Sequence, residues 1–129
     1  MTMWKDILFE KSVREILQGV KYDPAHHFGR PFLTAYQIAI EFSLRYPEDF
    51  KRIDLDVGGK GKGKHSSLAQ YIARQLSVKI KSGILPDIEG RFISNTHLQK
   101  ILFNHGGETV ESSLTDTQHD LSMYRFTGI

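Results

Sequence analysis

Residues 67–83 read SLAQYIARQLSVKIKSG, and this stretch carries the clearest fold signal in the chain. Ser67 and Gln70 have the spacing of a capping box, in which two side chains satisfy two backbone N–H groups at the start of a helix. Apolar residues then recur at helical spacing, and Gly83 is a typical helix stop. These apolar positions are Leu68, Ile72, Leu76 and Ile80. The sequence therefore predicts a helix over residues 68–82.

A second helix begins with the same signal further upstream. Thr34 and Gln37 repeat the capping-box spacing, and the residues that follow are apolar over much of the helix circumference. We therefore expect a helix at the centre of the core. Pro47 ends this helix or restarts it as a short turn.

Weaker patterns complete the expected secondary structure. Helical spacing of apolar residues covers residues 3–20, and a third capping-box spacing opens a short helix over residues 96–104. Alternating apolar and acidic residues predict a brief strand at residues 53–57, and residues 91–94 favour another. The tail around residues 123–126 supplies either an edge strand or a clip that packs on the core.

These elements together predict the fold class. We expect a mainly α fold, a compact helical bundle with a small β element, in which residues 1–129 form a single globular domain. The expected core consists of Tyr36, Ile40, Phe42, Leu44, Leu68, Ile72, Leu76, Leu98 and Leu102.

The composition excludes several classes of site. The chain contains no cysteine, so it forms no disulfide, thiolate zinc site or iron–sulfur cluster. Charged residues interrupt the apolar residues of the N-terminus, and no run of about 18 apolar residues occurs. We therefore expect a soluble, cytoplasmic protein that makes no contact with a membrane.

Positive charge is concentrated in the middle of the chain. The net charge is +2 overall, but residues 51–82 carry +6, between residues 1–50 at −1 and residues 83–129 at −3. A basic segment between acidic flanks is typical of a protein with an anionic partner such as nucleic acid. A solvated helix face next to a loop accounts for the same pattern.

The glycine-rich stretch at residues 58–66, GGKGKGKHS, comes close to a phosphate-binding P-loop. Gly58 and the pair Gly63-Lys64 have the P-loop spacing, but His65 stands where a serine or threonine should hold magnesium. Three interpretations stay open: a flexible linker, a looser anion-binding loop, and the loop of a phosphate-handling enzyme.

Residues 72–78 have the spacing found in the first helix of many helix-turn-helix domains, although Gly83 falls where a recognition helix would follow. A winged-helix alternative places its opening helix at residues 68–82, its next helix at 96–104 and its recognition helix from residue 109. That last segment is acidic, which is unfavourable for contact with bases and phosphates. The sequence establishes no family.

Other candidate chemistry is weaker. The six histidines include no pair at the spacing of a two-histidine metal face. The pairs Asp54 with Asp56 and Asp87 with Glu89 could hold magnesium for phosphodiester cleavage, but alternating acids are equally typical of a wet strand face.

The leading hypothesis is a small non-enzymatic module that contacts nucleic acid or another polyanion through the glycine-rich loop and the helix after it. An adaptor domain that binds a protein partner or forms a homo-oligomer is the first alternative, and a phosphate-handling enzyme is the second. The sequence predicts no catalytic residue, no metal and no cofactor. The predicted polyanion-binding residues are Lys60, Lys62, Lys64, His65, Arg74 and Lys81.

Overall fold

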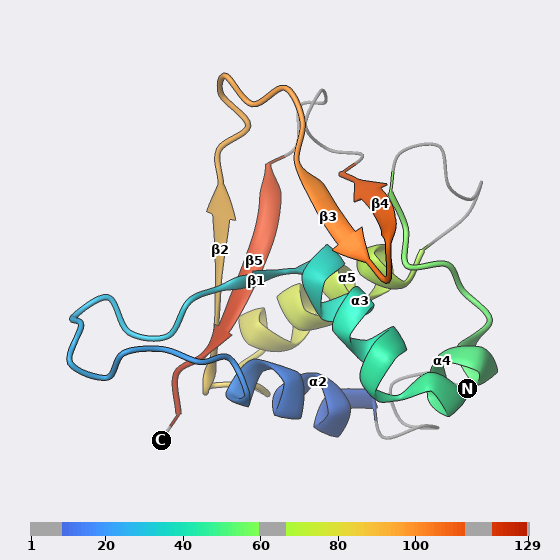
Figure 1. Cartoon of the computed structure of the whole chain (residues 1–129). Helices are drawn as coiled ribbons and strands as arrows, with labels where there is room; N and C mark the ends of the chain where they lie inside the picture. The colour runs from blue at the N-terminus through green and yellow to red at the C-terminus, as the bar shows by residue number, and fades with distance from the viewer. Residues whose placement is uncertain (1–8, 60–66, 113–119, 129) are drawn as a thin grey trace.

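The structure is a computed structural model that describes residues 9–59, 67–112 and 120–128. The described residues contain four helices and five strands (Figure 1). The helices are α2 (Phe9–Gln18), α3 (Ala35–Arg45), α4 (Pro47–Ile53) and α5 (Leu68–Lys81). The strands are β1 (Leu33–Thr34), β2 (Ile88–Ile93), β3 (Leu102–His105), β4 (Glu108–Glu111) and β5 (Leu121–Phe126).

Local signals set the ends of the two longest helices. Complete capping boxes start both: Thr34 with Gln37 at α3, and Ser67 with Gln70 at α5. After α5 the N–H of Ile84 donates to the Lys79 carbonyl, and the N–H of Gly83 donates to the Ile80 carbonyl. This is the Schellman arrangement, and Gly83 adopts the positive φ of 82° that it requires. The predicted starts of both helices and the stop at Gly83 are confirmed.

A three-stranded antiparallel sheet in the order β1-β5-β2 packs against the helices (Figure 1). Strand β5 lies in the middle, with Leu33 opposite Tyr124 on one side and Gly90 opposite Tyr124 on the other. The Tyr124 hydroxyl donates to the Ala73 carbonyl at 3.1 Å and lies 3.0 Å from the Ser77 hydroxyl. The centre of the sheet is thereby tied to α5.

Strands β3 and β4 form a separate hairpin that lies beside α3 (Figure 1). The Phe103 ring stacks on Tyr36 of α3, with 5.3 Å between ring centroids. The Nε2 atom of His105 lies 3.0 Å from the Ser43 hydroxyl, and Val110 is buried. The hairpin therefore extends the core over a second side of α3.

The core forms where α2, α3, α5 and the sheet meet. Phe9 of α2 packs on Phe42 of α3 with 4.7 Å between ring centroids, and both rings are fully buried. Six of the predicted core residues are buried: Tyr36, Ile40, Phe42, Leu68, Ile72 and Leu76. Two predictions are wrong, since Leu44 is 59% and Leu102 is 55% exposed, and Leu98 is only partly buried.

The prediction of a mainly α helical bundle is wrong, because the protein has a mixed α/β fold with two antiparallel sheets. The tail at residues 121–126 is the central strand of a sheet rather than an edge strand or a clip. The sequence concealed this because both neighbours of β5 lie far away along the chain, and strand pairing depends on those distant partners.

Two predicted elements differ for local reasons. The expected helix at residues 96–104 is absent, because the N–H of Thr96 donates to the Ser94 hydroxyl and His97 takes a positive φ of 61°. Residues 102–105 instead form β3. The expected strand at residues 53–57 is absent, because α4 extends to Ile53 and ends at Asp54 in the left-handed conformation.

Two further predictions hold in part. The predicted strand at residues 91–94 overlaps β2, which starts three residues earlier at Ile88. The predicted helix at residues 3–20 overlaps α2, and its first six residues lie outside the described part of the chain.

Candidate nucleic-acid interface

Helix α5 presents one face to the solvent. Its buried side consists of Leu68, Ala69, Ile72 and Leu76. Arg74 and Lys81, seven residues apart, lie on the opposite side, and both are exposed. No carboxylate among the described residues lies within ion-pair distance of either side chain. Within the described part of the chain, nothing neutralises these two cations, which share one helix face.

The sequence around this face is also basic. From Val57 to Pro86 the chain contains six lysines and arginines and no aspartate or glutamate. Of the predicted polyanion-binding residues, Arg74 and Lys81 share the exposed face of α5. Lys60, Lys62, Lys64 and His65 lie outside the described residues.

The described ends of the glycine-rich loop meet at the N-terminus of α5. The N–H of Leu68 donates to the Asp56 carbonyl at 2.8 Å, and the N–H of Ala69 donates to the Val57 carbonyl at 3.0 Å. Gly58 lies so close to Ser67 that a Cβ atom at residue 58 would be 2.6 Å from the serine hydroxyl oxygen. The loop therefore leaves and rejoins the fold beside the basic helix.

The same hydrogen bonds oppose a P-loop at the start of α5. A P-loop needs free backbone N–H groups that point at a phosphate. Here the N–H groups of Ser67 and Gln70 are used in the capping box, and those of Leu68 and Ala69 are used by residues 56 and 57. The start of α5 thus offers no free amide to a phosphate at residues 67–70.

A groove runs between α5 and the far end of the sheet, next to Lys81. Its cavity volume is about 370 Å³, and its walls are largely apolar. Phe92 of β2 stands at the groove with 70% of its surface exposed. The other lining residues are Ser77, Ile80, Gly90, Arg91, Ser122 and Tyr124. The sequence pattern predicts a strand at Phe92 but gives no sign that helix α5 leaves this side chain uncovered.

A second hollow, of about 760 Å³, lies in the loop at residues 20–32, which projects from the body of the molecule (Figure 1). Arg125 holds the base of this loop by donating to the Phe28 and Arg30 carbonyls at 2.6 and 3.2 Å. The guanidinium of Arg125 also lies 4.5 Å from the centre of the Phe32 ring. Phe28, at the tip, is 72% exposed.

Histidines and acids form no metal cluster in the described residues, since no group of three potential ligands comes together. His26 and His27 stack with 4.8 Å between ring centroids at the tip of the projecting loop. Two of the four acids considered as magnesium ligands are engaged elsewhere: Asp87 pairs with Arg14, and Glu89 pairs with both Arg91 and Arg125. The predicted carboxylate pair at residues 87 and 89 thus serves in ion pairs.

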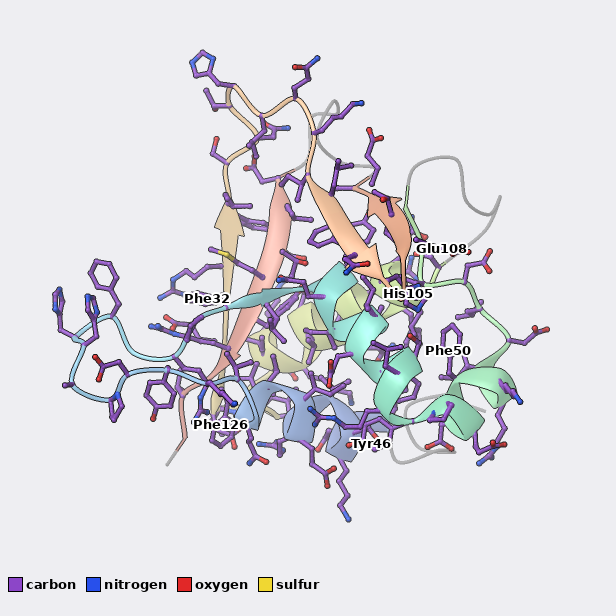
Figure 2. The ribbon with its side chains drawn as sticks, viewed as in Figure 1. Phe32, Tyr46, Phe50, His105, Glu108 and Phe126 are labelled. Atoms are coloured by element: carbon purple, nitrogen blue, oxygen red, sulfur yellow. The ribbon has the colours of Figure 1, made fainter. Side chains whose placement is uncertain are left out.

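Ser43 and His105 form a hydroxyl–imidazole contact at the end of β3, where His105 lies near Glu108 (Figure 2). Ser43 is only 8% exposed and donates its hydroxyl hydrogen to the Ile40 carbonyl at 2.7 Å. A serine nucleophile needs access to substrate and a base that accepts its proton. This pair instead anchors the hairpin to α3.

No helix within the described ranges is long and apolar enough to cross a membrane. No known protein family, curated protein or solved structure matches the chain.

Proposed function

We propose that this protein is a non-enzymatic module that binds nucleic acid through the exposed face of α5. The observation that carries the proposal is the pair of cations, Arg74 and Lys81, on the outer face of a helix with no acidic residue in its own sequence; neither has an ion-pair partner among the described residues. Phosphates of nucleic acid are bound mainly by lysine and arginine, and each contact gains free energy from the release of counterions.

The order of the elements supports the same proposal by analogy of fold. Helices α2, α3 and α5 with the sheet β1-β5-β2 follow the topology of a winged helix-turn-helix domain. In such a domain the third helix is the one that enters the major groove, and here that helix is α5. Fold analogy alone does not establish function, so the charge on α5 carries the argument.

This assignment differs from the winged-helix alternative drawn from the sequence. Helix α5 is the last described helix rather than the first, and residues 109–111 belong to β4 rather than to a recognition helix. The acidic character of that segment is therefore no argument against nucleic acid. Two features depart from a simple helix-turn-helix: residues 46–67 separate α3 from α5, and the β3–β4 hairpin interrupts the connection between β2 and β5.

The positions of the two cations suggest different contacts. Arg74 lies in the middle of α5, where a helix in the major groove approaches base edges, and arginine can bond guanine with two parallel hydrogen bonds. Lys81 is the last residue of α5, where the helix leaves the groove and meets the phosphate backbone. In the sequence, the lysines of the glycine-rich loop precede the other end of the same helix.

Salt-dependent titration against duplex DNA tests the proposal. Each phosphate contact contributes about 0.9 to the slope of log affinity against log salt. Lys81→Ala should lower the slope by about that amount, and should weaken binding equally for all sequences. Lys11→Ala removes another exposed lysine, on α2, and serves as the matched control with an unchanged slope.

Arg74→Lys separates base reading from charge. The substitution retains the positive charge but removes the two-pronged geometry, so the salt slope should stay constant while discrimination between sequences falls. Each arginine–guanine pair accounts for about 1–3 kcal/mol of such discrimination. Absence of binding to duplex DNA at micromolar protein and low salt would refute the proposed function.

A further inference from the structure

Strand β2 has an open edge. It is an outer strand of the three-stranded sheet, and no strand in the described part of the chain pairs with its free side. A free edge is a row of backbone donors and acceptors that can pair with another chain. Proteins commonly protect such edges with proline, with charged side chains, lysine above all, or with a bulge. The β2 sequence, IEGRFI, has no proline or lysine, and its pairing with β5 is continuous over six positions. Its charged residues are Glu89 and Arg91, which have opposite signs.

The end of this strand also exposes apolar side chains. Phe92 is 70% and Ile93 is 41% exposed, and because neighbouring residues of a strand point to opposite faces, both faces of the sheet carry an apolar group here. Strand pairing at this edge would cover Phe92. We infer that the partner is a second copy of this chain, whose β2 pairs antiparallel with the first across a two-fold axis.

Strand geometry restricts the register of this pairing. In an antiparallel ladder, residues that direct their backbone groups toward the neighbour face residues that do the same, and such residues alternate along β2. With a two-fold axis perpendicular to the sheet, one residue of β2 therefore faces the same residue of the second copy, and this residue defines the register. The axis also leaves the helices of both copies on the same side of one continuous sheet.

Charge then selects among the three central positions. An axis at Glu89 would place two glutamates face to face, and an axis at Arg91 would place two arginines face to face. An axis at Gly90 places Glu89 of each copy opposite Arg91 of the other, which gives two ion pairs across the interface. In that register Phe92 lies opposite Ile88 of the second copy, so an exposed aromatic ring meets an apolar neighbour.

The existing contacts of Glu89 and Arg91 are compatible with ion pairs to a second copy. Glu89 pairs with Arg91 at 2.5 Å and with Arg125 at 2.6 Å within one chain. The Arg91 side chain is 61% exposed and lies at the edge, where it also donates to the Gly90 carbonyl at 2.9 Å. A second copy would replace this local contact with a backbone hydrogen bond.

Sedimentation velocity over a range of protein concentration tests whether the pair forms. The native chain should shift from monomer to dimer as concentration rises, and Phe92→Lys should remain monomeric because it adds a charge at the edge. Phe28→Lys is the matched control: Phe28 is 72% exposed on the projecting loop, so its dimer should persist. Melting curves of both variants establish that they fold. A native chain that stays monomeric, or a Phe92→Lys variant that still dimerises, would overturn the inference.

Disulfide trapping tests the register directly, because the chain has no cysteine of its own. An equimolar mixture of Glu89→Cys and Arg91→Cys should give a mixed cross-linked dimer on mild oxidation, well above the cross-linking of either variant alone. Phe28→Cys mixed with either variant should give little. Equal cross-linking in all mixtures, or stronger cross-linking of one variant with itself, would overturn the register centred on Gly90.

Discussion

The substitution Gly58→Ala tests how the glycine-rich loop is joined to the fold. Gly58 has φ +122°, a conformation that residues with a side chain rarely adopt, and the cost of such strain is on the order of 1–3 kcal/mol. The added Cβ atom would also lie 2.6 Å from the Ser67 hydroxyl oxygen and 2.9 Å from its Cβ atom. Ser67 would have to move.

Movement of Ser67 has a defined consequence, because its hydroxyl accepts the hydrogen bond from the Gln70 N–H that caps α5. Loss of such a cap costs about 1 kcal/mol. Strain and cap together predict that Gly58→Ala lowers the free energy of unfolding by about 2–4 kcal/mol. The measurement is chemical denaturation followed by circular dichroism.

Gly83→Ala supplies the matched control. Gly83 also has a positive φ, +82°, but a Cβ atom there would meet nothing within 4 Å. Gly83→Ala should therefore lower the free energy of unfolding only by the backbone strain, about 1–2 kcal/mol. If Gly58→Ala destabilises the protein no more than Gly83→Ala, the contact between Gly58 and the cap of α5 does not constrain the fold.

Three further predictions concern the core and its connections. Ile72→Ala, at a fully buried position, should lower the free energy of unfolding by about 2–5 kcal/mol in denaturant titration, and an unchanged midpoint would remove Ile72 from the core. Tyr124→Phe removes the hydroxyl that joins β5 to Ala73 and Ser77 and should cost about 1 kcal/mol in the same assay; a neutral result would show that packing alone holds the sheet to α5. Burial, and then the hydrogen bond to Glu15, raise the pKa of Tyr46 above its usual value of 10.0. The stability that this shift contributes is complete below the usual pKa and is lost as the pH rises through the raised pKa of the folded state. The loss of stability at alkaline pH should therefore be smaller in Tyr46→Phe than in the native chain. Identical profiles of stability against alkaline pH would contradict this reasoning.

The sequence alone determined the features that depend on neighbouring residues. The capping boxes at Thr34 and Ser67 and the stop at Gly83 involve side chains and backbone groups within five residues of one another, so the pattern contains all the partners. The placement of Arg74 and Lys81 on one face is equally local, because helical geometry fixes the direction of residues seven apart.

Only the tertiary structure decided the strands and what they leave exposed. Strand β5 pairs with residues 33–34 and 88–93, and no local pattern in residues 121–126 identifies partners at those distances along the chain. The capping-box spacing at Thr96 failed for a local reason instead, since the Ser94 hydroxyl accepts the backbone N–H that the capping box would use.

The exposed Phe92 is the clearest feature that only the tertiary structure decided. Its sequence fits a strand with one buried face, but burial of that face depends on where α5 crosses the sheet. Helix α5 packs over Gly90, where Ile80 and Tyr124 approach the glycine, and leaves the end of β2 uncovered. A strand side chain is buried only if another element packs over it. The position of that element depends on the packing of the whole chain rather than on the residues next to the side chain in sequence.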